Sequence, residues 1–365
     1  MRREMTNAKN TLEEYIPASA VCPKTDERQL RVTICSHHIA ENKGGLASIT
    51  RLTAKEFANQ GFKVTILTCE DDGKFTHPNV AIIENPSHFR CLREIWVADY
   101  VICEGAALQL CWPLSLIPKK VVVVNHMARK RGGLVRRVLE RLISFHAVWC
   151  GVSRYVAEHE TIKTTVVPNA YDPKIFYPSA GERPYDLIFV GSMTNLKGVP
   201  LLFEAVKSLA ERGVRINRLT LVGEGPLAEV YKKQLSAGGF VACEVVFTGN
   251  LPTYGVAEQM RRHKCLIAPS VRLAQEAFGL VCIEGAGCGC YVIASDSGGL
   301  PEAVGPCGAI FKSDDSASLA DKIEAFLDGA SKVDEERVKQ HLSKYTPEAL
   351  VASYLKLMNG RRSLK

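Results

Sequence analysis

Residues 31–68 read RVTICSHHIAENKGGLASITRLTAKEFANQGFKVTILT, and this stretch predicts the fold class. Arg31–Ser36 is short, β-branched and mostly apolar, as a buried strand is. Apolar residues recur at helical spacing from Leu46 and stop near Gly61, and Lys63–Thr68 is a second strand-like run. A strand, a glycine-containing loop, a helix and another strand within 38 residues predict a βαβ unit with a parallel sheet.

The same alternation continues along the chain and then starts afresh. Between the two series lies a loop-like segment rich in proline, residues 173–184, which we interpret as an interdomain linker. We therefore predict two doubly wound, Rossmann-like α/β domains with parallel sheets, residues 31–172 and 185–345, facing each other across a cleft. Residues 1–30 would form a loosely ordered extension, and the helical end of the chain, residues 346–365, would pack back on the first domain. The remaining predicted strands are 80–83, 100–103, 120–124, 147–152, 165–167, 187–190, 219–222, 244–248, 264–268 and 291–294.

The composition is that of an ordinary globular protein, with 46% hydrophobic and 23% charged residues among 365. No apolar run approaches the ~18–20 residues of a bilayer-spanning helix. Residues 1–30 contain no apolar core like that of a secretory signal, so we expect a cytoplasmic protein. The 13 cysteines lie mostly inside apolar runs, and no C-x-x-C pair has a matching second pair. We therefore expect buried, structural cysteines and no metal site.

The net charge is +7, and its one local concentration lies between Arg129 and Arg141. No aromatic side chains interleave with these basic residues, which disfavours nucleic acid as a partner. The stretch could contact anionic lipid headgroups, which would place the protein at the inner face of a membrane, or a phosphorylated substrate. A solvated helix face explains the same residues equally well.

Residues 268–284, APSVRLAQEAFGLVCIE, carry the strongest functional signal. A strand ends at Pro269, and a helix is predicted to begin near Phe278, where its first turn would offer backbone N–H groups to an anion such as a diphosphate. Glu276 precedes this helix and Glu284 lies within it. Because a carboxylate beside a phosphate is repelled, we expect each of them to accept hydrogen bonds from sugar hydroxyls. A bare pair of glutamates at this spacing is more often structural, but the surrounding Pro-Ser and Phe-Gly favour a site.

A second anion-binding element is predicted in VGSMTNLKG, which joins the first strand of the second half to a helix. Gly191 would let the backbone approach a ligand closely, and Lys197 would supply a cation. In the first half, Gly44-Gly45 opens the first helix and His126 follows a predicted strand. A loop lysine is often solvated and a lone histidine is usually structural. Each of these residues alone is therefore weak evidence for a site, and only their combination supports one.

A weaker pattern is GEGPLA at Gly223–Ala228, which fits the G-x-G-x-x-A motif of dinucleotide-binding proteins. It lies in the second half of the chain rather than at the first strand–helix turn. Pro226 also suits the first position of any helix because of its fixed φ. The pattern is therefore poor evidence for an NAD-dependent oxidoreductase.

Taken together, these segments resemble the family-4 retaining glycosyltransferases of GT-B fold, over nearly the whole chain from about residue 31. Besides the glutamates at 276 and 284, the family-like stretches are VSRYVAEHE (152–160), VVPNAYDPKIF (166–176), LVGEGPL (221–227), VFTGNL (246–251) and SDSGGLPEAV (295–304).

The resemblance implies roles for residues of the second half. Glu276 would contact the donor sugar and the reacting face, Glu284 the ribose hydroxyls, and Lys197 a phosphate. The backbone would meet the sugar and the diphosphate at Phe278, Gly279 and Leu280.

In the first half, the resemblance implies that His126 contacts the transferred sugar and that Gly44-Gly45 admits the donor phosphates and the acceptor. Such enzymes need no D-x-D metal site, so neither a metal nor another cofactor is expected. The donor would be a nucleotide diphosphate sugar, with UDP favoured by its frequency in the family. The acceptor would be a sugar, a lipid-linked compound or a small molecule.

The sequence departs from the family pattern at two positions. The family commonly has an arginine after the glycine that matches Gly191, where this chain has Ser192. Ala170 stands where a glycine usually follows the asparagine that matches Asn169. We hypothesise that Arg272, in the loop that carries the first glutamate, partly replaces the missing phosphate cation.

The implied reaction is transfer of a glycosyl group with retention by front-face attack, in which the leaving diphosphate accepts the acceptor's proton. Lys197 and the helix start near Phe278 would stabilise the leaving group. Two alternatives remain open. One is a non-hydrolysing sugar-nucleotide epimerase, which shares the two-domain architecture and needs no acceptor. The other is a non-catalytic protein that binds a nucleotide sugar.

Overall fold

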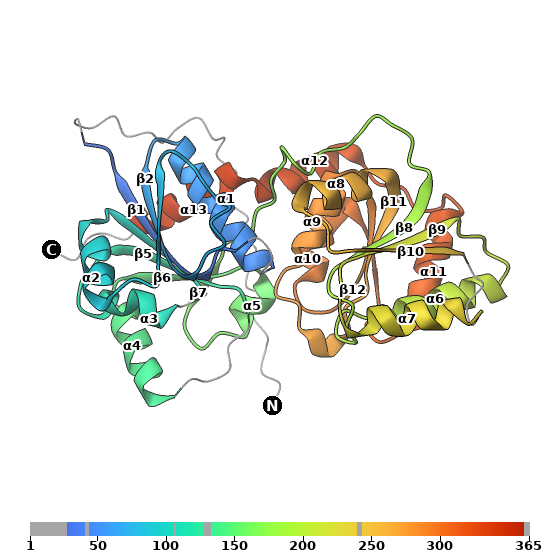
Figure 1. The fold of residues 1–365 in the computed structure, drawn as a ribbon, viewed down its shortest axis with the longest axis horizontal. Coiled ribbons are helices and arrows are strands. Elements are labelled where there is room, and N and C mark those ends of the chain that lie inside the picture. Colours follow the sequence, from blue (N-terminus) through green and yellow to red (C-terminus); the bar gives the residue numbers. More distant parts are fainter. Residues whose placement is uncertain (1–27, 41–43, 106, 128–132, 239–242, 361–365) are drawn as a thin grey trace, which may run out of the picture.

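Residues 31–68 form the predicted βαβ unit, with β1 (Arg31–His38), α1 (Gly45–Asn59) and β2 (Lys63–Glu70), and the two strands are parallel. The computed structural model describes residues 28–40, 44–105, 107–127, 133–238 and 243–360. Two α/β domains lie side by side in it (Figure 1). The predicted fold class is thereby confirmed.

The first domain surrounds a parallel sheet of seven strands. Its further elements are β3 (Val80–Glu84), α2 (His88–Val97), β4 (Tyr100–Glu104), α3 (Leu108–Cys111), β5 (Lys120–Asn125), α4 (Leu134–Ser144), β6 (Ala147–Gly151), α5 (Arg154–Glu158) and β7 (Thr164–Val166). The strand order is β3-β2-β1-β4-β5-β6-β7. Val32 and Ile34 pack on the side of α1, whereas Cys35 and Leu67 pack on the side of α2, so both faces of the sheet are buried.

The second domain surrounds a parallel sheet of six strands. Its elements are β8 (Tyr185–Val190), α6 (Val199–Glu211), β9 (Arg218–Val222), α7 (Pro226–Ser236), β10 (Glu244–Gly249), α8 (Thr253–Arg262), β11 (His263–Ala268), α9 (Leu280–Gly287), β12 (Tyr291–Ser295), α10 (Leu300–Val304), β13 (Gly308–Phe311), α11 (Ser316–Leu327) and α12 (Glu335–Leu342). The strand order is β10-β9-β8-β11-β12-β13. Helices α6 and α11 share one buried layer, and α8, α9 and α10 share the other.

The predicted strands all appear in the structure, with ends that differ by at most two residues, but β13 was not predicted. It has only four residues and begins with Gly308, whose sequence neighbourhood gives no strand pattern. The glycine has a packing reason, because a Cβ there would lie 1.8 Å from the carbonyl oxygen of Val292 in the neighbouring strand.

Both sheets have the same winding, which determines where a ligand can bind. In each, the strand order reverses between the first and fourth strands, at β1 and β4 in one sheet and at β8 and β11 in the other. The helices that follow such a pair leave in opposite directions and open a crevice at the carboxyl ends of the strands. The loops that follow these four strands are therefore the places to look for a site.

The chain crosses between the domains twice. Residues 173–184 form no helix or strand, and the last helix, α13 (Pro347–Gly360), returns to the first domain. There, Asn359 Oδ1 accepts hydrogen bonds from Tyr100 Oη at 3.1 Å and from Lys120 Nζ at 2.9 Å. Most of the predicted N-terminal extension, residues 1–27, and the end of the chain, residues 361–365, lie outside the described residues.

The cysteines of the described ranges are free thiols, and all but Cys69 and Cys243 are buried. The expectation of burial is confirmed for the other cysteines of these ranges but not for these two.

Candidate active site

A lysine and a glutamate from the two loops at the switch point of the second sheet form an ion pair. Lys197 Nζ lies 2.5 Å from Glu276 Oε1, and Ser270 Oγ donates a hydrogen bond to the same oxygen at 2.8 Å. The side chains of Lys197 and Glu276 are 37% and 17% exposed, so the pair is accessible but not fully solvated. The sequence predicted both charged residues; it also contains Ser270, which was not singled out.

The loops meet because their backbones are in direct contact. Val271 N donates a hydrogen bond to Leu196 O at 3.0 Å. Gly198 has φ +72°, and a Cβ at this position would lie 1.8 Å from Pro269 O. Only glycine permits this approach, which brings Lys197 over the loop of Glu276.

The helix after Glu276 begins at Leu280, two residues later than predicted. Gly279 precedes it with φ +97°, which the helix cannot continue through. Phe278 is 2% exposed and packs its ring against Tyr345, with centroids 5.4 Å apart. Phe278 therefore anchors the loop, while Gly279 and Leu280 lie at the helix N-terminus, where backbone N–H groups lack intrahelical partners.

Gly298 and Gly299, which belong to the family-like stretch 295–304, contact the backbone of this loop. Gly299 N donates to Glu276 O at 2.7 Å, and a Cβ on Gly298 would lie 2.1 Å from the same oxygen. The position of Glu276 is thus fixed by backbone contacts on two sides.

Glu284 lies within α9 and is half-buried. Among the described residues, none donates a hydrogen bond or forms an ion pair with its carboxylate. Burial raises the pKa of Glu284 from 4.5 to about 7. A half-buried acid without a partner is unfavourable for folding, so Glu284 is a candidate ligand-binding group.

The first domain touches the start of α9. A Cβ on Gly45 would lie 2.9 Å from Leu280 Cδ1, and Gly44 caps α1 with φ +81°. Ser153 Oγ donates a hydrogen bond to Ala277 O across the same boundary. The predicted glycine pair therefore does lie against the helix start predicted to bind phosphate.

His126 lies at the end of β5, and no contact in the described residues joins it to Lys197 or Glu276. Its Nε2 is 2.6 Å from Glu104 Oε2. Glu104, the last residue of β4, is 0% exposed and was missed in the sequence because YVICE resembles an ordinary buried strand. Its position at the end of a central strand was the available signal.

The remaining predicted residues of the second domain have different environments. Gly191 has φ +154°, and a Cβ on Gly223 would lie 2.2 Å from Gly191 O, so the G-x-G turn serves the packing of two loops. Arg272 is exposed in a 3₁₀ turn, with its backbone N 3.3 Å from Asp314 Oδ1. No contact joins its side chain to Lys197 among the described residues, and its role as a substitute cation stays a prediction.

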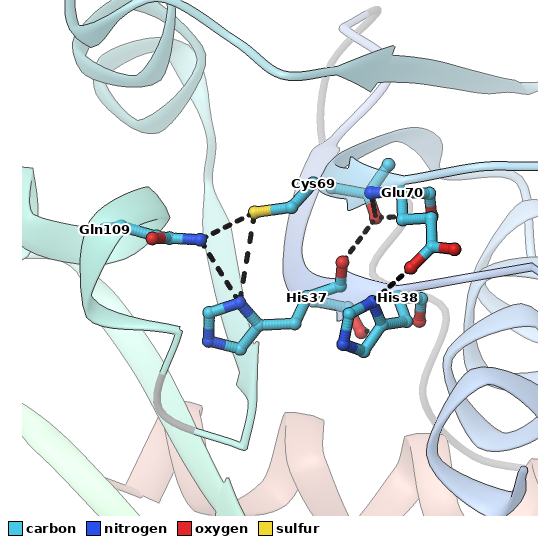
Figure 2. Close-up of polar contacts among 7 residues, drawn as sticks. His37, His38, Cys69, Glu70 and Gln109 are labelled. Carbon is cyan, nitrogen blue, oxygen red and sulfur yellow. Dashed lines mark hydrogen bonds and ion pairs between the residues drawn. The ribbon is translucent and has the colours of Figure 1, made fainter. Parts of the chain in front are cut away.

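A polar cluster at the ends of β1 and β2 was also missed (Figure 2). Gln109 Nε2 lies 2.8 Å from Cys69 Sγ and 3.3 Å from His37 Nδ1. Beside it, His38 Nδ1 lies 3.0 Å from Glu70 Oε2. Burial and the neighbouring His38 lower the pKa of His37. Within the described ranges, no group of three or more His, Cys, Asp and Glu side chains is arranged to hold a metal ion.

Comparison with known proteins identifies the second domain. Residues 184–329 match the family model described as "Glycosyl transferases group 1". The chain is 27% identical over 190 residues to the phosphatidylinositol N-acetylglucosaminyltransferase gpi3 subunit of Schizosaccharomyces pombe. It is 34% identical over 200 residues to the D-inositol 3-phosphate glycosyltransferase of Acidothermus cellulolyticus. These matches cover 50% and 48% of this chain but only 41% and 43% of the relatives, so the chain spans less than half of their length.

Solved structures share the whole two-domain architecture. A glycosyltransferase from Rickettsia africae superposes with a TM-score of 0.74 at 16% identity, covering 92% of this chain and 99% of that one. HepE from Anabaena in complex with UDP gives 0.73 at 16% identity, covering 91% of this chain and 100% of that one. At this identity the likeness shows the fold, which is GT-B.

Proposed function

We propose, from the match of residues 184–329 to the group 1 glycosyl transferase family, that this chain transfers a sugar from a nucleotide diphosphate donor to an acceptor hydroxyl with retention. The observation that carries the proposal is the Lys197–Glu276 pair beside the N-terminus of α9. A cation and a helix N-terminus together suit a diphosphate, and the carboxylate suits the sugar attached to it.

The proposed transfer separates charge in the donor, and the protein must stabilise that charge. As the anomeric C–O bond breaks, positive charge develops on the sugar and negative charge on the leaving diphosphate. Lys197 and the first N–H groups of α9 would stabilise the leaving group electrostatically. Glu276 Oε1 lies 2.5 Å from Lys197 Nζ, so donor phosphates would share that cation with this carboxylate or displace it.

Glu276 and Glu284 would bind hydroxyl groups of the donor. Glu276 would accept from the donor sugar, and the unpartnered Glu284 from the ribose, since both would be repelled by the phosphates themselves. A UDP-sugar is the favoured donor, in keeping with the UDP complex of the HepE structure. The names of the two relatives, which mention phosphatidylinositol and inositol 3-phosphate, favour a lipid-linked or small polyol acceptor.

Nucleotide diphosphates test the proposal without knowledge of the acceptor. A ligand that binds only the folded state raises the melting temperature by mass action. Because a UDP-sugar is the favoured donor, we expect UDP to raise it more than GDP or ADP. NMR of the donor alone would detect epimerisation, and release of UDP that depends on an acceptor would show transfer. If no nucleotide diphosphate shifts the melting temperature, the proposal is wrong; binding without turnover would favour a non-catalytic protein.

We further propose that the protein is cytoplasmic and that helix α4 is the part of its first domain that binds the anionic inner face of a membrane. Its exposed apolar side chains include Val135 (75%), Val138 (51%) and Leu142 (40%), and Phe145 (68%) follows directly after the helix. Arg137 and Arg141 are exposed on the same helix. Among the helices of the described ranges, none has the length and apolar character needed to cross a bilayer. Apolar residues flanked by arginines instead suit interfacial binding. Arg129 and the basic residues next to it lie outside the described residues.

Vesicle co-sedimentation tests this surface. We expect binding to rise with the anionic lipid fraction, and the double variant Arg137→Ala/Arg141→Ala to weaken it by about tenfold or more, at roughly 1 kcal/mol per arginine. The double variant Lys207→Ala/Arg215→Ala removes the same charge from the second domain and should bind normally. Sedimentation that does not depend on anionic lipid would rule out the electrostatic part of the proposal.

A further inference from the structure

We propose that Glu104 is a positioning residue that holds His126 through Nε2 and leaves Nδ1 as the ring atom that meets the substrate. The proposal rests on the proposed function, because it deepens the role of His126 toward the transferred sugar. Nothing in the family-like stretches of the sequence marks this glutamate.

The two carboxylate oxygens of Glu104 differ in their surroundings, because only Oε2 has a hydrogen-bond partner among the described residues. Oε2 lies 2.6 Å from His126 Nε2, slightly shorter than the ~2.7–2.9 Å of most charge-assisted N–H···O hydrogen bonds. Oε1 is buried and has no hydrogen-bond partner among the described residues. A carboxylate that is 0% exposed at the end of a core strand is unfavourable for stability, so packing alone does not explain its presence.

The titratable neighbours of this acid on other elements carry no charge near neutral pH. Cys150 on β6 is 0% exposed, and burial together with the Glu104 charge raises its pKa to about 12. Tyr354 on α13 is also 0% exposed; burial, with Glu104 and Cys150, raises its pKa well above its usual value. Both groups stay neutral near pH 7, and the side chain that hydrogen-bonds Glu104 among the described residues is His126.

The hydrogen bond from Nε2 to Glu104 determines which ring nitrogen of His126 is left to contact the substrate. His126 is 12% exposed, and its Nδ1 has no hydrogen-bond partner among the described residues. With Nε2–H donated to Glu104, Nδ1 is the ring atom left for a sugar or phosphate group, as an acceptor in the neutral ring and as a donor in the imidazolium.

NMR of the unaltered protein with ¹⁵N-labelled histidine tests the assignment before any variant is made. We expect a strongly downfield ring proton bonded to Nε2 of His126, the signature of a short hydrogen bond to a carboxylate. An Nε2 that carries no proton would overturn the proposal. This measurement needs no donor, so it stands apart from the fate of the proposed function, which fails if no nucleotide diphosphate binds.

The isosteric variant Glu104→Gln tests the functional consequence. We expect the downfield proton to shift upfield and kcat/KM to fall by about tenfold, mostly in kcat, because a neutral hydrogen bond replaces a charge-assisted one. Glu94→Gln is the matched control, since Glu94 is also buried in the first domain but pairs with Arg90 at 2.9 Å. Equal losses in the two variants, or an unchanged proton signal in Glu104→Gln, would assign Glu104 a merely structural role.

Discussion

We expect Lys197→Ala to lower kcat/KM for the donor by about 100-fold or more, the loss that follows removal of one preorganised group that stabilises a developing anion. The structure gives the reason, since Lys197 Nζ is the cation that reaches the loop preceding α9 and lies 2.5 Å from Glu276 Oε1. Steady-state kinetics with the donor found by thermal shift would measure the effect.

A matched variant separates this loss from general damage. Lys207→Ala removes an exposed lysine of α6 whose nearest carboxylate, on Glu211, is 4.0 Å away, and should leave kcat/KM unchanged. The melting temperature of Lys197→Ala must also be measured, because the substitution leaves Glu276 with Ser270 as its remaining side-chain partner. A loss smaller than about threefold, far below that expected for such a group, would remove Lys197 from the mechanism.

We expect Glu284→Gln to stabilise the fold at pH 8 while it weakens donor binding about tenfold, a common exchange at functional sites. Burial raises the pKa of Glu284 from 4.5 to about 7, so the folded state holds this proton more tightly than the unfolded state. Its contribution to the free energy of unfolding therefore falls as pH rises between these values and stays unfavourable above them. The shift corresponds to at most about 3 kcal/mol.

Unfolding in denaturant at pH 5 and pH 8 measures this effect. The gain from Glu284→Gln should be present at pH 8 and much smaller at pH 5, where the native side chain is already protonated. Glu56→Gln replaces another buried glutamate, one that already accepts a hydrogen bond from Gln60 at 2.8 Å, and controls for the substitution itself. Equal stability of Glu284→Gln and the unaltered protein at both pH values would contradict the prediction.

The sequence predicted the layout of the fold because each buried strand leaves a local signature. Runs such as RVTICS and KVTILT are recognisable without their neighbours, whereas β13 is not, because its four residues start at a glycine that only the adjacent Val292 explains. The start of α9 was placed two residues early because Phe278 is apolar and continues the helical pattern. Its burial against Tyr345 depends on a segment 67 residues further along the chain.

The candidate site was predictable as a set of loops but not as a set of contacts. Lys197 and Glu276 each follow a strand, and their residue types suggested a phosphate and a sugar. Their pairing depends on β8 and β11 being neighbours, which the order of strands along the chain does not reveal. Glu104 was missed for a related reason, since one acid at the end of an apolar run acquires meaning only beside His126.

The return of α13 to the first domain affects the order in which the protein can mature during synthesis. Leu350, Val351 and Tyr354 belong to the interior of that domain, yet the ribosome makes them after the whole second domain. Domains usually fold in the order of their synthesis. Here the first domain cannot complete its core until α13 has been synthesised, so part of its interior stays exposed to solvent. The second domain can therefore complete its folding before the first.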